Sequence, residues 1–215
     1  MRGFDGLQWS AADAGTLTTL PSTGSLLAGA ELAVNTTTAG GQEWASVAVL
    51  ANGDSVVTWS SYGQDGDGWG VYGQRFDAAG TRLGAEFQVN SYTASQQYNS
   101  TVTALAGGGF VINWTSYQGG NYYEVSGQIY DGAGIRRGAE FHVNSYVTGD
   151  QYQPQIVGTA DGGFVTIWTS YNQDGSAEGV YGQRFDSNGN RLGTEFPINS
   201  YTTSSQYQPA ATALA

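Results

Sequence analysis

Two aspartates lie two residues apart in a glycine-rich loop, Asp65-Gly66-Asp67-Gly68. Calcium takes hard oxygen ligands from such closely spaced loop positions. Asp174 follows the same Tyr-x-Gln motif in a later copy of this loop. Calcium is therefore the cofactor that the sequence predicts, with Asp65, Asp67 and Asp174 as candidate ligands. The alternative is an ordinary solvated turn, because the loop lacks the later bidentate glutamate of an EF-hand.

The same aspartate pair could in principle hydrolyse a glycosidic bond. That chemistry needs two carboxyls roughly 5–10 Å apart across a cleft, one with a raised pKa. Two residues of one hairpin loop meet this requirement poorly. His142 is the one histidine and has no partner carboxylate at motif spacing. No Ser-His-Asp order, phosphate loop or zinc spacing is present. The sequence thus predicts no catalytic residue and a protein that is not an enzyme.

Aromatic and amide side chains recur in the polar loops. Hydroxylated rings can stack on sugars while amides bond to hydroxyls. A structural corner is the alternative explanation for their recurrence. The predicted ligand-binding residues are Tyr62, Trp69, Tyr92, Tyr98, Tyr117, Tyr146, Tyr152, Tyr171, Tyr201, Asn90, Asn144, Asn199, Gln97, Gln151 and Gln206.

A repeat of 54 to 55 residues organises these loops. The segment VYGQRFD at 71–77 returns as VSGQIYD at 125–131 and as VYGQRFD at 180–186. The segments EFQVN, EFHVN and EFPIN recur at the same period, and so does WSSY or WTSY. Agreement of three segments at one period is a strong signal for a repeat architecture.

Each unit contains four short apolar stretches separated by glycine-rich turns, which is typical of four antiparallel strands. The second stretch is apolar at nearly every residue, as expected for a strand covered on both faces. We therefore predict an all-β fold, a four-bladed β-propeller of four-stranded antiparallel blades. The chain would be one domain, 1–215, with blade 1 from residues 1–37 plus the C-terminal strand 205–215, blade 2 at 41–92, blade 3 at 96–146 and blade 4 at 150–201.

Two further repeated features have structural interpretations. Trp59, Trp114 and Trp168 end the second strand and are predicted to pack between blades rather than to bind sugar. Arg75 and Glu86 stand on adjacent strands, and Arg184 and Glu195 repeat the arrangement. The sequence predicts that each of these two pairs forms an ion pair within its blade.

Composition limits the partners. The chain has 7 Lys plus Arg against 18 Asp plus Glu, a net charge of −11. Nucleic acid binding needs clustered cations, so no nucleic acid partner is expected. No apolar stretch is long enough to span a bilayer, so no membrane insertion is expected either. There is no cysteine, which excludes disulfides and thiolate metal sites.

The repeat core, GGFV-x-I-W-x-S-Y followed by QDG, GVYGQRFD and LG-x-EF-x-VN, resembles tandem repeats of large secreted bacterial proteins. These include RTX-type adhesins and calcium-binding surface proteins. In size the chain is similar to hemopexin-type propellers, and its aromatic clefts are similar to those of propeller lectins. The resemblance implies an extracellular, secreted or cell-surface location and a role in recognition or assembly.

Together these observations predict an extracellular non-enzymatic binding module that recognises carbohydrate through aromatic and polar clefts between blades. Its partners would be glycans or a cell-surface or matrix component. The alternative is a structural or self-assembling surface or filament subunit, in which the same rim makes protein–protein contacts.

Overall fold

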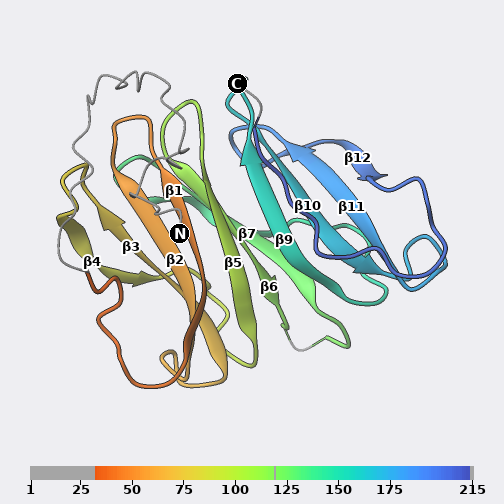
Figure 1. Ribbon diagram of the computed structural model, residues 1–215, viewed down its shortest axis with the longest axis horizontal. Helices are drawn as coiled ribbons and strands as arrows, with labels where there is room; N and C mark the ends of the chain where they lie inside the picture. The colour runs from red at the N-terminus through yellow and green to blue at the C-terminus, as the bar shows by residue number, and fades with distance from the viewer. Residues whose placement is uncertain (1–31, 119, 214–215) are drawn as a thin grey trace, which may run out of the picture. The chain divides into compact units, whose positions relative to one another are not determined.

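The computed structural model describes residues 32–118 and 120–213, and every regular element in these ranges is a β-strand. Twelve strands form three antiparallel sheets of four, each in sequence order (Figure 1). The predicted all-β fold of four-stranded blades is thereby confirmed. The strands are β1 Gln42–Val49, β2 Ser55–Tyr62, β3 Trp69–Phe76 and β4 Arg82–Gln88 in blade 2; β5 Gln97–Ala104, β6 Phe110–Ser116, β7 Glu124–Tyr130 and β8 Arg136–His142 in blade 3; and β9 Gln151–Gly158, β10 Phe164–Tyr171, β11 Glu178–Phe185 and β12 Arg191–Pro197 in blade 4.

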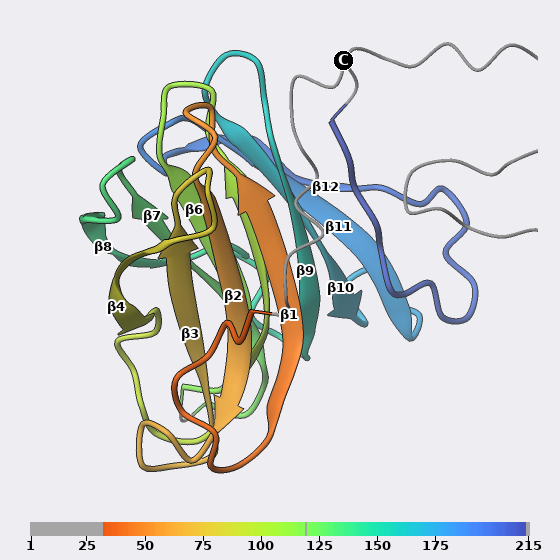
Figure 2. The ribbon, with the colours of Figure 1, turned by 60° about the vertical axis from the view of Figure 1, so that its left-hand side comes forward.

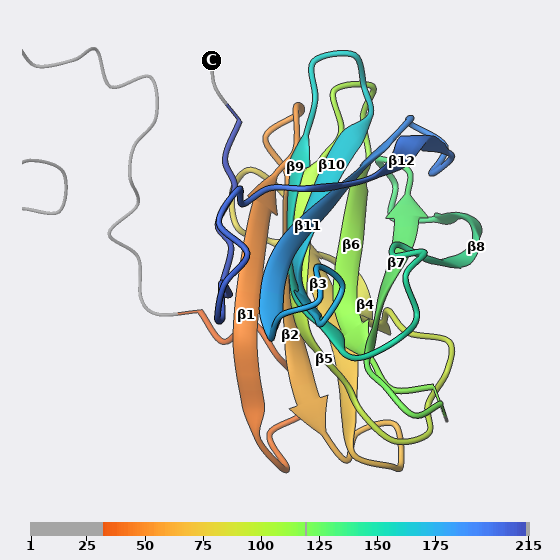
Figure 3. The ribbon, with the colours of Figure 1, turned by 90° about the vertical axis from the view of Figure 1, so that its right-hand side faces the viewer.

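The predicted fourth sheet is absent from the described residues, which form three propeller-type blades rather than four. Residues 1–31 of the predicted blade 1 lie outside the described part of the chain, and residues 199–213 form no strand. The C-terminal segment instead contacts blade 4 through single hydrogen bonds. The backbone amide of Gln206 donates to the Glu178 carbonyl at 2.8 Å, and the backbone amide of Gln208 donates to Thr169 Oγ1 at 3.3 Å. Figure 3 shows the C-terminal segment in dark blue.

The core of each sheet is formed by its second and third strands. All seven residues of β6 are buried, and β2 and β10 are nearly as covered. Apolar clusters fill the spaces between blades 2 and 3 and between blades 3 and 4. Trp59, Trp114 and Trp168 are at most 3% exposed. Trp114 and Trp168 belong to the two apolar clusters, so these two pack between blades as predicted.

The first strands of neighbouring blades contact one another, β1 with β5 and β5 with β9 (Figure 2). Each carries a bulge whose extra residue has a positive φ, at Trp44, Asn99 and Gln153. The bulge amide is not part of the ladder and bonds to the preceding blade. Asn99 N donates to Ser60 Oγ at 3.0 Å, and Gln153 N donates to Thr115 Oγ1 at 3.1 Å. The bulges of β5 and β9 therefore link blade 3 to blade 2 and blade 4 to blade 3.

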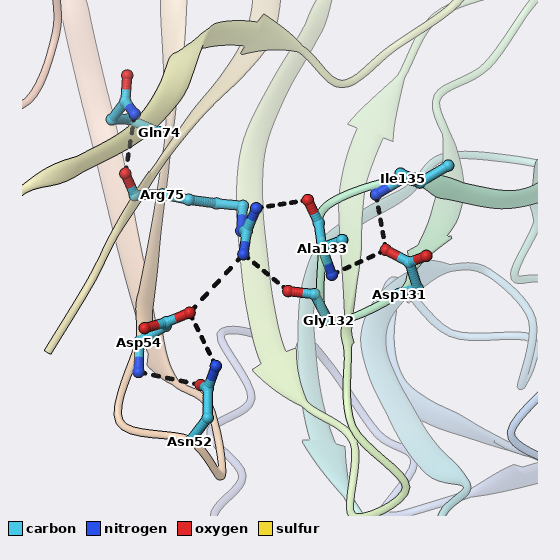
Figure 4. A network of polar contacts seen from close by, with 8 residues as sticks. All are labelled: Asn52, Asp54, Gln74, Arg75, Asp131, Gly132, Ala133 and Ile135. Atoms are coloured by element: carbon cyan, nitrogen blue, oxygen red, sulfur yellow. Dashed lines mark hydrogen bonds and ion pairs between the residues drawn. The ribbon is translucent and has the colours of Figure 1, made fainter.

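The predicted ion pair between Arg75 and Glu86 is wrong. The Arg75 guanidinium lies 3.8 Å from Asp54 and donates at 2.7 Å to the carbonyl of Gly132 in the β7–β8 turn of blade 3 (Figure 4). Arg184 likewise approaches Asp161, at 4.0 Å, rather than Glu195. Successive side chains along a strand point to opposite faces of the sheet, so a shift of one residue in register places two side chains on different faces. The arginines accordingly meet the turn beside them, and the glutamates meet the loops at the other end of the blade.

Candidate functional site

An asparagine closes the loop that follows the fourth strand of each blade. Asn144 Oδ1 accepts from the Val125 amide at 2.8 Å, and its Nδ2 donates to the Tyr146 carbonyl at 2.9 Å. Asn90 and Asn199 make the same two bonds in blades 2 and 4. These three amides therefore hold the loop against the third strand.

A carboxylate stands beside this asparagine in blades 2 and 3, but it comes from a different part of each repeat. In blade 2, Asp65 of the β2–β3 loop accepts from Asn90 Nδ2 at 3.3 Å. In blade 3, Glu124 at the start of β7 accepts from Asn144 Nδ2. Glu124 occupies the register position of Gly70. A side chain at Gly70 would overlap the Asp65 carboxylate, so only one of the two positions can supply the group.

A second carboxylate lies on the fourth strand of every blade. In blade 3, Glu140 Oε2 accepts from the Ser91 amide at 2.9 Å and from the Ser91 hydroxyl at 2.7 Å. Its Oε1 accepts from Gln118 Nε2 at 2.9 Å. Glu86 and Glu195 have the same kinds of donor in their blades. Three hydrogen-bond donors directed at one carboxyl hold the Glu140 side chain in one orientation.

In blade 3 an open cleft lies beside this carboxylate. The residue opposite the buried tryptophan is Tyr72 in blade 2 and Tyr181 in blade 4, but Ser126 in blade 3. The smaller side chain leaves a cleft of about 340 Å³, lined by Ser91, Tyr92, Gln118, Ser126, Glu140, Phe141 and His142. An adjoining cleft of about 350 Å³ shares Gln118 and His142 and is lined by Glu124 and Tyr122.

The two carboxyls of blade 3 thus have contrasting environments. Burial raises the pKa of Glu124 above its ordinary value, and the Glu195 and Asp150 carboxylates raise it further, against the hydrogen bond from Asn144. Glu140 instead has three hydrogen-bond donors. A carboxyl with a raised pKa near a second carboxyl held by hydrogen-bond donors is an arrangement that general acid and base catalysis can use.

In blade 2 a tyrosine ring takes up the corresponding space. Burial raises the pKa of Tyr72 to about 12, and the nearby Asp65 and Glu86 carboxylates add to the shift. The phenol therefore stays protonated between two acidic groups. Burial and the carboxylates of Asp174 and Glu195 likewise raise the pKa of Tyr181 in blade 4.

The three predicted calcium ligands bond to different residues and not to a shared site. Asp65 faces Gln88 and Asn90, whereas Asp67 accepts from the Ser95 amide at 2.9 Å. Asp174 accepts from the Ser176 amide within its own loop. Within residues 32–118 and 120–213, no group of three His, Cys, Asp or Glu side chains is arranged to hold a metal ion. In the same ranges, no helix has the length and apolar character needed to cross a membrane.

The predicted ligand-binding residues fall into three groups. Asn90, Asn144, Gln97 and Gln151 are at most 2% exposed and bond within the loops, while Asn199 and Gln206 repeat their bonds at partly exposed positions. Tyr92 lines the blade 3 cleft. The remaining rings lie at the loop end of the blades: Tyr62, Trp69, Tyr98 and Tyr117 contact other rings, Tyr146 donates to the Asn172 carbonyl, Tyr152 donates to Glu178, and Tyr171 and Tyr201 are exposed.

Glu124 and Glu140 were not predicted as a pair from the sequence. Glu140 belongs to a motif that recurs in every repeat, so the sequence does not distinguish it from Glu86 and Glu195. Glu124 carried a usable signal: it replaces a glycine of blades 2 and 4 in the same unit that lacks the loop aspartates. A coordinated loss and gain of a carboxylate indicates that the two positions serve one place in space.

Comparisons with known proteins are as follows. No protein-family model matches the chain, and a search of curated proteins finds no match. Among solved structures, the chain is similar to an α-L-arabinofuranosidase from Lactobacillus brevis, at 7% identity and a TM-score of 0.50, covering 73% of this chain and 53% of that one. It is also similar to an endo-arabinase from Bacteroides thetaiotaomicron, at 10% identity and a TM-score of 0.45, covering 79% of this chain and 60% of that one.

The chain therefore spans about half the length of the arabinofuranosidase structure, and at 7% identity this likeness establishes the fold alone. The likeness is nevertheless to an enzyme. The prediction of a non-enzymatic carbohydrate-recognition module, with a self-assembling surface or filament subunit as its alternative, is corrected on this ground. The prediction that the chain is not an enzyme is corrected with it.

Proposed function

We propose that this chain hydrolyses glycosidic bonds in the two adjoining clefts of blade 3, with Glu124 as general acid and Glu140 as general base. The observation that carries the proposal is the pairing of a carboxyl with a raised pKa and a carboxyl with three hydrogen-bond donors. They line two adjoining clefts that share Gln118 and His142. The fold of an arabinofuranosidase is consistent with this chemistry.

Each carboxyl has one task in the reaction. Glu124 gives its proton to the oxygen of the departing sugar as the anomeric C–O bond breaks. Glu140 takes a proton from the water whose oxygen bonds to the anomeric carbon. The proton lost by Glu124 equals the one gained by Glu140, so exchange with solvent restores both groups. Asn144 and Gln118 orient the two carboxyls before substrate arrives.

The proposal is tested by assaying release of reducing ends from soluble arabinan, xylan and mannan, and of nitrophenol from 4-nitrophenyl α-L-arabinofuranoside. We expect the parent protein to hydrolyse at least one, and Glu140→Gln to lower its rate by about 10²- to 10⁴-fold. The matched control is Glu86→Gln, the same strand position in a blade where Tyr72 fills the space, and it should retain the parent rate. Equal rates for Glu140→Gln and the parent would overturn the proposal.

Several sequence predictions stay proposals beside this one. One proposal is a fourth blade from residues 1–37 and 205–215. It is supported by the backbone amide of Gln206, which donates to the carbonyl of Glu178. The backbone amide of Gln151, where blade 4 begins, donates to the carbonyl of Tyr123 in the same way. Calcium binding, secretion and kinship with the repeats of secreted bacterial proteins also remain predictions. A calorimetric titration with calcium tests the first of these three.

A further inference from the structure

Six aromatic rings from blades 2 and 3 form one continuous row. Successive ring centroids are 5.0 to 5.7 Å apart, in tilted or edge-to-face contact. Such spacing and geometry are typical of favourable aromatic pairs. In order along the row the rings are Tyr62, Trp69, Trp44, Tyr98, Tyr123 and Tyr117. We call these six residues the aromatic row.

Trp44 occupies an unusual position in this row. It is the bulge residue of β1 and has a φ of 53°, a conformation that a bulky side chain rarely adopts. The corresponding bulge residues of β5 and β9 are amides, Asn99 and Gln153. The Trp44 side chain is nonetheless 43% exposed, so burial does not explain a tryptophan here. Because all three bulges share a positive φ, what sets β1 apart is the large exposed ring at its bulge, a feature that suits a binding surface.

A cleft opens along the row. It has a volume of about 250 Å³ and is lined by Trp44, Trp69, Gln96, Tyr98 and Tyr123. None of these five side chains carries a charge at neutral pH. Burial, with Tyr123 close by, raises the pKa of the Tyr98 hydroxyl, which therefore remains a neutral hydrogen-bond donor. The cleft offers apolar ring faces with hydroxyl and amide groups at their edges.

This chemistry matches an uncharged sugar chain. The C–H face of a pyranose or furanose ring packs on an aromatic face, while its hydroxyls bond to phenol and amide groups. An anionic polysaccharide would lack any cation here to pair with. The row also ends at Tyr117 and Tyr123, which immediately precede Gln118 and Glu124 of the proposed catalytic clefts in the chain.

We propose that the aromatic row is a binding subsite for a neutral polysaccharide, separate from the carboxyls that cleave it. The inference rests on the proposed function for the link to cleavage, but binding can be measured without it. The subsite would hold the chain by ring stacking at Trp44 and its neighbours.

The test is native affinity electrophoresis in gels containing soluble arabinan, xylan or mannan, which reports binding whether or not the bond is cleaved. The parent protein should be retarded by at least one polysaccharide. Trp44→Asn places at the bulge a residue found in blade 3, so its fold should persist, and its affinity should fall about tenfold. Tyr62→Ala should weaken binding as well, whereas Tyr207→Ala, at an exposed ring outside the row, should not.

The outcomes separate the two proposals. Retardation that depends on Trp44 without hydrolysis of any polysaccharide would support the subsite and overturn the proposed function. Hydrolysis that depends on Glu140 with retardation unchanged in Trp44→Asn and Tyr62→Ala would overturn the subsite. No retardation of the parent protein by any of the three polysaccharides would also overturn it.

Discussion

Gln118 Nε2 donates to Glu140 Oε1 at 2.9 Å and also reaches Ser126 Oγ at 3.4 Å. The equivalent glutamines of blades 2 and 4 bond to Glu86 and Glu195. What distinguishes blade 3 is therefore the serine, not the carboxylate. A glutamine bonds to the glutamate in every blade, and in blade 3 a serine replaces the tyrosine that lies beside it.

The first prediction concerns that serine. Ser126→Tyr restores the residue of blades 2 and 4 at the same register position, so the ring should fill the cleft and lower hydrolysis at least about 100-fold. Because the neighbouring blades accommodate this ring, the melting temperature should change by less than about 4 °C. Enzyme assay and thermal denaturation of one preparation test both statements. A fully active Ser126→Tyr would refute the role of the cleft, and Tyr72→Ser in blade 2 serves as the reciprocal control, with unchanged activity.

A second prediction follows from the raised pKa of Glu124. A carboxyl with a folded pKa above its unfolded value of about 4.3 binds more protons when folded, so its contribution to stability is lost as pH rises between those values. Glu124→Gln does not titrate. Its melting temperature should therefore gain on that of the parent as pH rises from about 4 to about 7. A difference that stays constant, or shrinks, over this range would mean that the pKa of Glu124 is not raised.

The pH dependence of the hydrolysis rate should also report the pKa of Glu124. The general acid must be protonated, so the hydrolysis rate should fall as pH rises through the pKa of Glu124. The descending limb of the pH–rate profile is the measurement. Glu195 and Asp150 both raise that pKa, so Asp150→Asn should move the limb to lower pH. A limb that does not move would exclude Glu124 as the titrating acid.

Stability across the junction of blades 2 and 3 depends on Arg75. Its guanidinium is 13% exposed and bonds to the turn of the next blade, so Arg75→Met should cost about 1.5–3 kcal/mol of unfolding free energy. Arg184 is its repeat equivalent, with a side chain 55% exposed and an aspartate at 4.0 Å. Arg184→Met should cost less than about 1 kcal/mol. Urea denaturation of both variants measures the contrast, and equal losses would contradict this account of the junction.

Much of the architecture could be predicted from the sequence because the repeat reports it three times. The apolar runs ending in Trp59, Trp114 and Trp168 predicted buried second strands, and these tryptophans are buried. The ion pair between Arg75 and Glu86 could not be excluded, since adjacency on neighbouring strands does not reveal which face each side chain takes. That depends on register, which shifts at a bulge between Gly73 and Arg75 in the β3–β4 ladder.

The candidate site was harder to predict for a related reason. The sequence directed attention to what recurs, the loop aspartates and tyrosines. The candidate site depends on two residues that do not recur, Ser126 in place of tyrosine and Glu124 in place of glycine. A missing side chain has no chemistry of its own, so its effect becomes visible only when the space around Glu140 is known.

In the proposed reaction Glu124 protonates the leaving oxygen. The most direct test compares Glu124→Gln with the parent on two substrates, a neutral polysaccharide and 4-nitrophenyl α-L-arabinofuranoside. Nitrophenolate departs without a proton, so the rate should fall about 10²- to 10⁴-fold on the polysaccharide and much less on the nitrophenyl glycoside. Glu178→Gln, at the first position of β11, should leave both rates unchanged. An unchanged rate on the polysaccharide, or an equal loss on both substrates, would contradict the claim.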